Sequence, residues 1–170
     1  MTVEDKETLT EAPRKETDTA PLRLPESMRD DSDLPKIGLD SEAQIGIVSI
    51  LTPLLADEVL FYTLLRKYHW NVTGPQFYSL HAAFEEQYTV MADLIDEIAE
   101  RIRQYGAMSI GTLTEFSERS RFEEQPGVNP NARQMVIDIM ERHEELIRYL
   151  REDIDKGCPT VVARPESEHT

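Results

Sequence analysis

The chain has very little of several features that mark other classes of protein. It holds one cysteine, Cys158, so no disulfide can form within its 170 residues. No segment reaches the roughly 18 consecutive apolar residues of a membrane helix, and the polar N-terminus lacks the apolar stretch of a signal peptide. No run of alternating β-branched residues is bounded by turn signals, so no strand is predicted. These absences favour a cytoplasmic, all-α protein with no membrane partner.

Basic residues are also scarce. The sequence has 18 Lys and Arg against 33 Asp and Glu, a net charge of -15. Contacts to phosphates need clustered Lys and Arg, so this balance disfavours unaided binding to nucleic acid or to an anionic membrane. An acidic surface favours cations, but charge alone does not identify a metal-binding protein.

The composition divides the chain into one domain with two tails. Residues 1–40 mix charges with Pro, Thr and Ser and predict a disordered arm. The arm has 11 acidic and 6 basic residues, a net of -5, so we do not expect it to bind DNA. Residues 41–156 carry helical patterns. Residues 157–170 have two prolines and no amphipathic pattern, which predicts an irregular tail.

Three long helices are predicted within residues 41–156. The first runs from about Ser41 to His69 and is kinked or restarted at Pro53, with Thr52 as cap. The second runs to Tyr105, with Ser79 as cap and Gly106 as a left-handed stop, and residues 112–117 could form a short helix in the connection after it. The third begins at Asn129 and Pro130 and ends before Gly157. No candidate for a fourth long helix follows.

Five residues of metal-ligand type occur at regular spacing: His69, His81, Glu85, Asp96 and Glu100. Residues 79–105 contain no proline or glycine, so the last four should share one helix face. Glu85 and Asp96 would lie about 16 Å apart along that helix, too far to bind one ion. Only a second, antiparallel copy could bring the two halves together, so the spacing predicts a metal site shared across a two-fold homodimer.

The same residues have a simpler interpretation. His81 and Glu85 could form a helix cap and charge pair, and Asp96 with Glu100 could be a solvated acidic face paired with nearby arginines. Other acidic residues are more often surface charge than ligands, and the histidine of the third helix is most often a packed core or interface residue. These are Asp57, Glu58, Glu86, Asp93, Glu97 and His143.

The strings HWNVTGPQF, LHAAFEEQY and DEIAERI decide between these interpretations. From about Leu39 to Lys156 the chain resembles the Dps family of ferritin-like mini-ferritins. In that family a His-Trp pair ends the first helix, a second histidine opens the next, a carboxylate follows four residues on, and an Asp-x-x-x-Glu pair comes eleven residues later. Glu85 is a departure, because the family usually has aspartate there. The resemblance implies a ferritin-like helical bundle assembled as a hollow dodecamer.

The resemblance also implies an activity. The family oxidises Fe(II) to Fe(III), with hydrogen peroxide as the expected oxidant or dioxygen as the alternative, and stores the ferric mineral, which protects against oxidative stress. His69, His81 and Glu85 of one chain would bind the iron with Asp96 and Glu100 of its partner, and these five would be both ligands and catalytic residues. Three carboxylates and two imidazoles suit Fe(II), with Mn(II) and Zn(II) as alternatives, at one or two metals per site.

Further roles follow only from the resemblance. Trp70 would lie beside the metals, as a redox-active group or as an interface filler, and Asp153 with Asp155 would line an iron-access pore. Two alternative functions stay open. One is a DNA-compacting, nucleoid-associated bacterial protein. The other is a truncated helical scaffold that assembles poorly, because the fourth bundle helix was not found.

Overall fold

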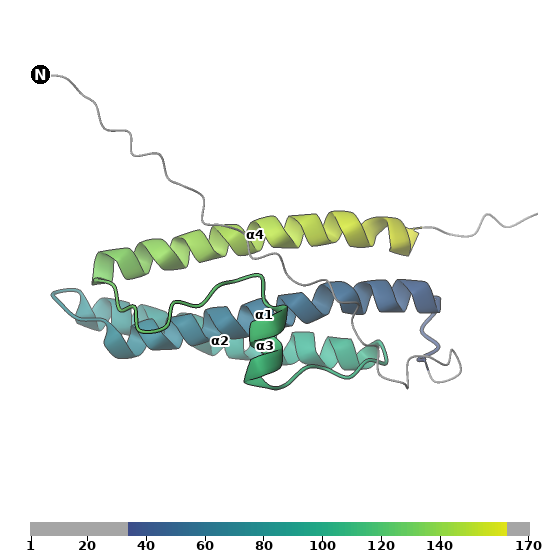
Figure 1. The fold of residues 1–170 in the computed structure, drawn as a ribbon, viewed down its shortest axis with the longest axis horizontal. Helices are drawn as coiled ribbons and strands as arrows, with labels where there is room; N and C mark the ends of the chain where they lie inside the picture. Colours follow the sequence, from purple (N-terminus) through teal and green to yellow (C-terminus); the bar gives the residue numbers. More distant parts are fainter. Residues whose placement is uncertain (1–33, 163–170) are drawn as a thin grey trace, which may run out of the picture.

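The computed structural model describes residues 34–162, and their side chains as far as Asp155. It has four helices: α1 (Ser41–Asn71), α2 (Phe77–Gln104), α3 (Leu113–Arg119) and α4 (Ala132–Val162). The long helices α2 and α4 both run antiparallel to α1, and the short α3 crosses the bundle (Figure 1). The described residues form no strand, which confirms the all-α prediction. The predicted arm, as far as residue 33, and the tail from residue 163 lie outside this description.

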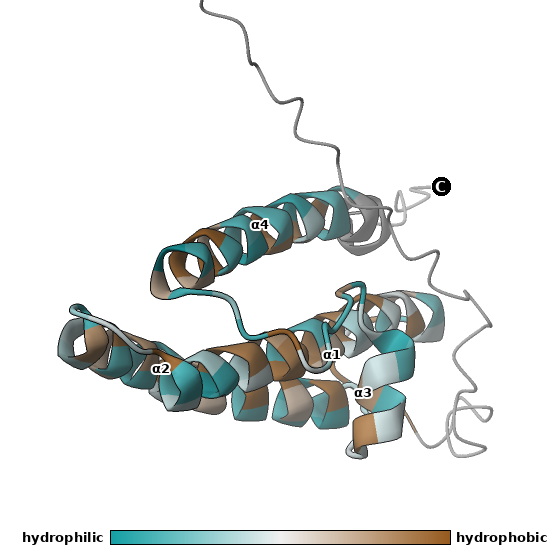
Figure 2. Ribbon diagram, turned by 60° about the vertical axis from the view of Figure 1, so that its left-hand side comes forward, coloured by the Kyte–Doolittle hydropathy of each residue, from teal (hydrophilic) through white to brown (hydrophobic). Residues whose placement is uncertain are grey.

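Helix α1 is the central element of the bundle. It packs against α2, α3 and α4, and Leu55, Phe61 and Leu65 on it are at most 1% exposed. By length and composition α1 could cross a membrane, but a helix surrounded by other helices has the same composition. Apolar residues recur along the length of α1 (Figure 2). Its position in the core therefore accounts for its hydropathy.

The predicted start of α1 is confirmed, but the predicted restart within it is wrong. The Asp40 carboxylate accepts a hydrogen bond of 2.7 Å from the Ala43 amide and caps the helix. Pro53 lies inside one continuous helix. The Thr52 hydroxyl donates to the Val48 carbonyl at 2.9 Å, so Thr52 bonds within the helix instead of capping a new one.

The ends of α2 were predicted with mixed success. The helix begins at Phe77, so Ser79 is not its cap, and the Ser79 hydroxyl instead donates to the Gln76 carbonyl at 3.0 Å. Gly106 is the predicted left-handed stop, with φ +88°. A Cβ at this position would also lie 2.8 Å from the Pro35 ring, so only glycine fits there. The short connecting helix predicted at residues 112–117 exists as α3.

Helix α4 starts later and ends later than predicted. Its first turn is capped by Asn131, whose side chain accepts from the Gln134 amide at 3.0 Å, and not by Asn129. The helix continues through Gly157 and Pro159 to Val162, so the predicted irregular tail is wrong for residues 157–162.

At the other end of the chain, residues 34–40 were assigned to the disordered arm. Part of this segment packs on the bundle instead: Leu34 is only 8% exposed, and the Gln44 side chain donates to the carbonyls of Pro35 and Leu39, both at 3.1 Å.

Asp57 is fully buried, so its prediction as surface charge is wrong. Its carboxylate accepts hydrogen bonds from the Ser120 hydroxyl at 2.9 Å and from the Arg121 amide and Nε, both at 2.7 Å. Arg121 also bonds Asp153 at 2.9 Å, which ties α1, the segment after α3 and α4 together. Asp153 is buried in this ion pair, whereas Asp155 is exposed, so of the two residues predicted to line a pore only Asp155 is accessible in the single chain.

Glu58, also predicted on the surface, is buried at 4% exposure. Among the described residues nothing donates a hydrogen bond to its carboxylate, and burial, with the nearby charge of Asp57, raises its pKa to about 7. The folded state therefore binds this proton more tightly than the unfolded state does, and stability falls as the pH rises from the unfolded pKa through the folded one.

We therefore expect the free energy of unfolding to fall by up to about 3 kcal/mol between pH 5 and pH 8. Each unit of difference between the folded and unfolded pKa values of Glu58 contributes about 1.4 kcal/mol to this fall. Glu58→Gln should remove most of this slope, and the matched variant Glu42→Gln, at an exposed position on the same helix, should keep it. Urea unfolding at the two pH values measures the difference. An unchanged slope in Glu58→Gln would contradict the assignment.

Candidate metal centre

A tight turn brings the end of α1 against the start of α2. The Val72 amide donates to the Tyr68 carbonyl at 2.8 Å and ends α1, and the Val72 side chain is buried. Gly74 has φ +102°, a conformation that favours glycine, and its carbonyl accepts from the Phe77 amide at 3.0 Å. The chain reverses direction within residues 72–76, so residues twelve apart in sequence come side by side.

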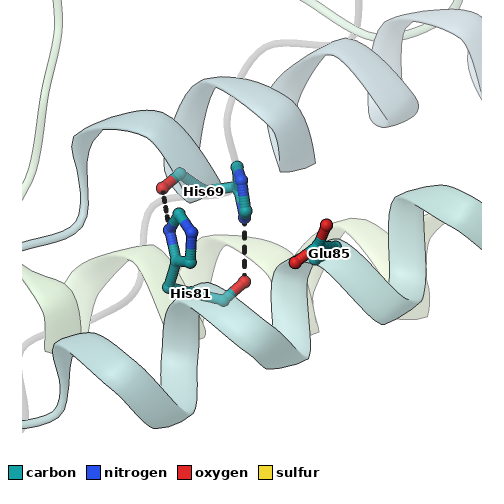
Figure 3. Close-up of side chains that lie close together, drawn as sticks. All are labelled: His69, His81 and Glu85. Carbon is teal, nitrogen blue, oxygen red and sulfur yellow. Dashed lines mark hydrogen bonds between the residues drawn. The ribbon is translucent and has the colours of Figure 1, made fainter.

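The paired residues are His69 and His81, which exchange two hydrogen bonds. His69 Nδ1 lies 2.9 Å from the carbonyl oxygen of His81, and His81 Nδ1 lies 2.8 Å from the carbonyl oxygen of His69 (Figure 3). The rings stack, with centroids 3.6 Å apart and planes inclined by 21°. The arrangement fixes both the position and the plane of each imidazole.

The hydrogen bonds also decide which nitrogen can bind a metal. A carbonyl oxygen only accepts, so each Nδ1 must carry a proton. In the neutral imidazole this leaves the lone pair on Nε2 free for coordination. An orienting bond of this kind, from the second ring nitrogen to a carbonyl, is the usual support of a metal-binding histidine. Both rings are therefore prepared as Nε2 ligands.

Glu85, one turn after His81 on α2, completes a group of three. One ligand atom from each of the three residues lies within 4.8 Å of the others. Two ligands on one ion, with bonds of about 2.0 to 2.2 Å, lie at most about 4 Å apart, so small side-chain rotations suffice to bind a metal. His69 is buried, His81 is half-buried and Glu85 is exposed, so the group opens to the surface from a fixed base.

Aromatic rings surround the histidine pair. Phe77 stacks on His81 with centroids 5.0 Å apart, and the edge of Tyr88 meets His69 at 5.3 Å. These contacts exclude water from part of the rings' surface and limit ring rotation. Sequence patterns did not single out Phe77 or Tyr88, although both lie within one or two helical turns of His81, where such neighbours are expected.

Arg66 holds a second group of rings next to the histidines. Its guanidinium carbon lies 4.9 Å from the Trp70 ring centroid and 5.6 Å from those of Tyr62 and Tyr88. Cation–π contacts of this kind are favourable even at exposed sites. Trp70 itself is 63% exposed. The predicted tryptophan therefore lies at the edge of the site, on the molecular surface.

The structure does not bring the other two predicted ligands into this group. Asp96 and Glu100 are exposed on the same continuous helix α2 as His81. Because α2 is unbroken from Phe77 to Gln104, Asp96 stays about 16 Å beyond Glu85 along the helix axis. One chain thus contains a three-ligand half-site and, further along, a separate pair of carboxylates.

Comparison with known proteins places this geometry in a family. Residues 48–156 match the model of the ferritin-like domain. A low temperature-induced protein of Nostoc is 42% identical over 121 residues, which cover 71% of this chain and 68% of that protein. DNA protection during starvation protein 2 of Bacillus anthracis is 38% identical over 64% of this chain and 74% of its own length. The chain belongs to the Dps family.

Solved Dps structures agree with this assignment. The Dps protein of Vibrio cholerae, described as a member of a superfamily of ferritin-like diiron-carboxylate proteins, aligns with a TM-score of 0.70 at 30% identity. The alignment covers 75% of this chain and 79% of that one. Dps from Staphylococcus aureus aligns with a TM-score of 0.64 at 35% identity, over 68% and 76% of the two chains. The ferritin-like bundle and a general role in iron storage and protection follow from this membership.

The half-site should bind a transition metal through His81. We expect His81→Ala to weaken binding of Co(II), followed by its visible absorption, by at least about tenfold, since even supporting residues of metal sites contribute that much. His143→Ala is the matched control, because His143 lies on α4 outside the group. Equal Co(II) affinity in the two variants would show that the group is not a metal site.

Proposed function

We propose that this chain oxidises Fe(II) to Fe(III) at sites completed by a second copy of itself and stores the ferric product. The observation that carries the proposal is the half-site, two histidines with fixed Nε2 donors and a carboxylate within 4.8 Å. Imidazole and carboxylate are ligands that suit Fe(II), and the described group contains no thiolate to favour softer ions. Mn(II) and Zn(II) fit the same donors and are expected to compete.

A second copy supplies what one chain lacks. In an antiparallel pair of α2 helices, Asp96 of one copy lies opposite Glu85 of the other, and Glu100 lies opposite His81. Both contacts form together because the Glu85–Asp96 pair and the His81–Glu100 pair are centred on the same point of the helix. The completed site has two imidazoles and three carboxylates, with room for one or two iron ions. By family likeness we propose that such dimers assemble further into a hollow dodecamer in the bacterial cytoplasm.

The expected oxidant is hydrogen peroxide, and dioxygen is the alternative. Two Fe(II) ions each give up one electron. Peroxide accepts both electrons and two protons, its O–O bond breaks, and two water molecules form. This stoichiometry consumes Fe(II) and peroxide together and leaves neither to generate hydroxyl radical. Fixed Nε2 donors hold the iron while the exposed side of Glu85 leaves access for the oxidant.

Mixing two inactive variants tests the shared site. His81→Ala and Asp96→Ala should each abolish fast Fe(II) oxidation, because each removes a ligand from every site. When equal amounts are unfolded and refolded together, half of the dimers are mixed, and one of the two sites in each mixed dimer is intact. Activity should return to about a quarter of wild type.

The control is each variant refolded alone, which should stay inactive. Iron oxidation is followed by the absorbance of the ferric product. No recovery in a mixture that assembles normally would exclude a site shared between copies.

The names of several relatives mention DNA protection, but the charge of this chain does not favour DNA binding. At about 150 mM salt the protein should not retard linear DNA in a gel, because its net charge of -15 opposes contact with phosphates. Retardation at that salt which disappears on deleting residues 1–40 would instead support a DNA-compacting, nucleoid-associated protein.

A further inference from the structure

A cavity of about 610 Å³ lies between α1, α4 and the segment that connects α3 to α4. This segment runs along the two long helices towards the start of α4 (Figure 1). Two contacts hold it in place: Lys67 Nζ donates to the Gln125 carbonyl at 3.0 Å, and the Arg142 guanidinium donates to the Glu123 carbonyl at 3.5 Å. The volume of the cavity is typical of pockets that bind small organic molecules.

The cavity is separate from the metal half-site and from α2. None of His69, His81 and Glu85 lines it. Glu141, which does, lies about 160° around α4 from His143, the residue through which α4 contacts α2. All the lining residues belong to residues 60–145 of one chain. A molecule in this cavity would therefore touch neither the proposed iron ligands nor helix α2.

The inner wall of the cavity is apolar and aromatic. Phe61, Tyr68 and Phe122 are at most 4% exposed and belong to the core cluster, and Leu60 and Leu64 pack against that cluster. An apolar group that contacts this wall is removed from water, and the gain in free energy grows with the area buried. The wall therefore favours a ligand with an apolar body over a bare ion.

Every basic residue of the lining already has a partner. Lys67 donates to a backbone carbonyl, and Arg121 belongs to the buried ion pairs described above. Arg142 pairs with Glu145 at 3.0 Å, and its guanidinium carbon lies 4.2 Å from the centroid of the Phe122 ring. No basic group of the lining is therefore left uncommitted to neutralise an anion.

Several acidic residues of the lining, in contrast, have no cationic partner. Glu123, Glu124 and Glu141 are exposed, and no described residue pairs with their carboxylates. Asp138 accepts hydrogen bonds from neutral groups, among them the Tyr68 hydroxyl at 2.6 Å. A carboxylate next to an apolar wall attracts a cation more strongly than one in open water, because the effective dielectric constant is lower. The unbalanced charge of the cavity is thus negative.

We propose that this cavity binds an organic cation, an ammonium or amidinium group on an aromatic or branched aliphatic body. The body packs on the apolar inner wall, and the charged group meets the carboxylate of Glu141 and those of the connecting segment. The chain itself contains an example of this recognition, because the Arg142 cation lies over the Phe122 ring and pairs with Glu145. An organic anion would meet the unpaired carboxylates instead.

Two probes with the same ring system and opposite charge test the preference. At neutral pH 1-naphthylmethylamine is a cation and 1-naphthylacetic acid is an anion. In titration calorimetry of the full chain, the cation should bind at least about tenfold more tightly than the anion, because like charges brought together are unfavourable. A cation that binds no better than the anion, or not at all, would overturn the proposal.

A charge variant locates the binding, since the whole chain is acidic and attracts cations in general. Glu141→Gln should weaken binding of the cation by about threefold, as expected for the loss of one partly solvated ion pair. Glu97→Gln removes the same charge from an exposed position on α2 outside the cavity, and should leave the affinity of wild type.

A second pair of variants blocks the cavity. Thr63 and Thr89 are both exposed, and each hydroxyl donates to the carbonyl four residues earlier, at 2.8 Å and 2.7 Å, but only Thr63 lines the cavity. Thr63→Arg should lower the affinity for the cation by at least about tenfold, because it adds bulk and a competing positive charge. Thr89→Arg is the matched control and should bind as wild type does.

Far-UV circular dichroism checks that all four variants keep their helical content. If Glu141→Gln and Thr63→Arg bind the cation as tightly as their controls, the probe binds the acidic surface in general and the proposal is wrong. The metal half-site contributes nothing to this measurement, so loss of the proposed iron chemistry in other variants leaves the result unchanged.

Discussion

Two hydrogen bonds between side chain and backbone, exchanged by His69 and His81, hold the metal half-site together. His69 lies in the last turn of α1, where carbonyl oxygens have no partner within the helix. The His81 imidazole donates to one of these oxygens and so caps α1. In return, the His81 carbonyl fixes the ring of His69. This pair of hydrogen bonds caps the end of α1, joins α1 to α2 and leaves both Nε2 lone pairs free. The site therefore depends on the packing of the two helices, and that packing depends on the two histidines of the site.

This dual role explains why the half-site is rigid on one side and open on the other. His69 is buried between α1 and α2, and Tyr88 and Phe77 limit the movement of the two rings. Glu85 has no comparable restraint and is exposed. A ligand group with two fixed members and one adaptable member can accept an incoming ion without reorganising the bundle. The carboxylate also remains free to meet ligands contributed by a second copy.

The sequence predicted what depends on local pattern and failed where distant residues decide. The histidine and carboxylate spacing predicted a cluster that includes His69, His81 and Glu85, and its metal binding stays a prediction. Helical periodicity predicted the long helices to within a few residues at most ends. Burial of Asp57 was not predictable, because Arg121, its partner, is 64 residues away and a lone aspartate on a helix is usually a surface residue. The late end of α4 was missed because Gly157 and Pro159 normally stop a helix.

The three sides of α2 have different roles, and this has a consequence for assembly. One side packs on α1 through Phe84 and Ile98, one carries the ligand residues, and one carries Val90 and Leu94. A single two-fold contact produces only a dimer, because its symmetry closes with two copies. A larger closed shell requires at least one further interface. The side of α2 with Val90 and Leu94 is distinct from the side with His81, Glu85, Asp96 and Glu100, so a contact there would leave the proposed ligands in place.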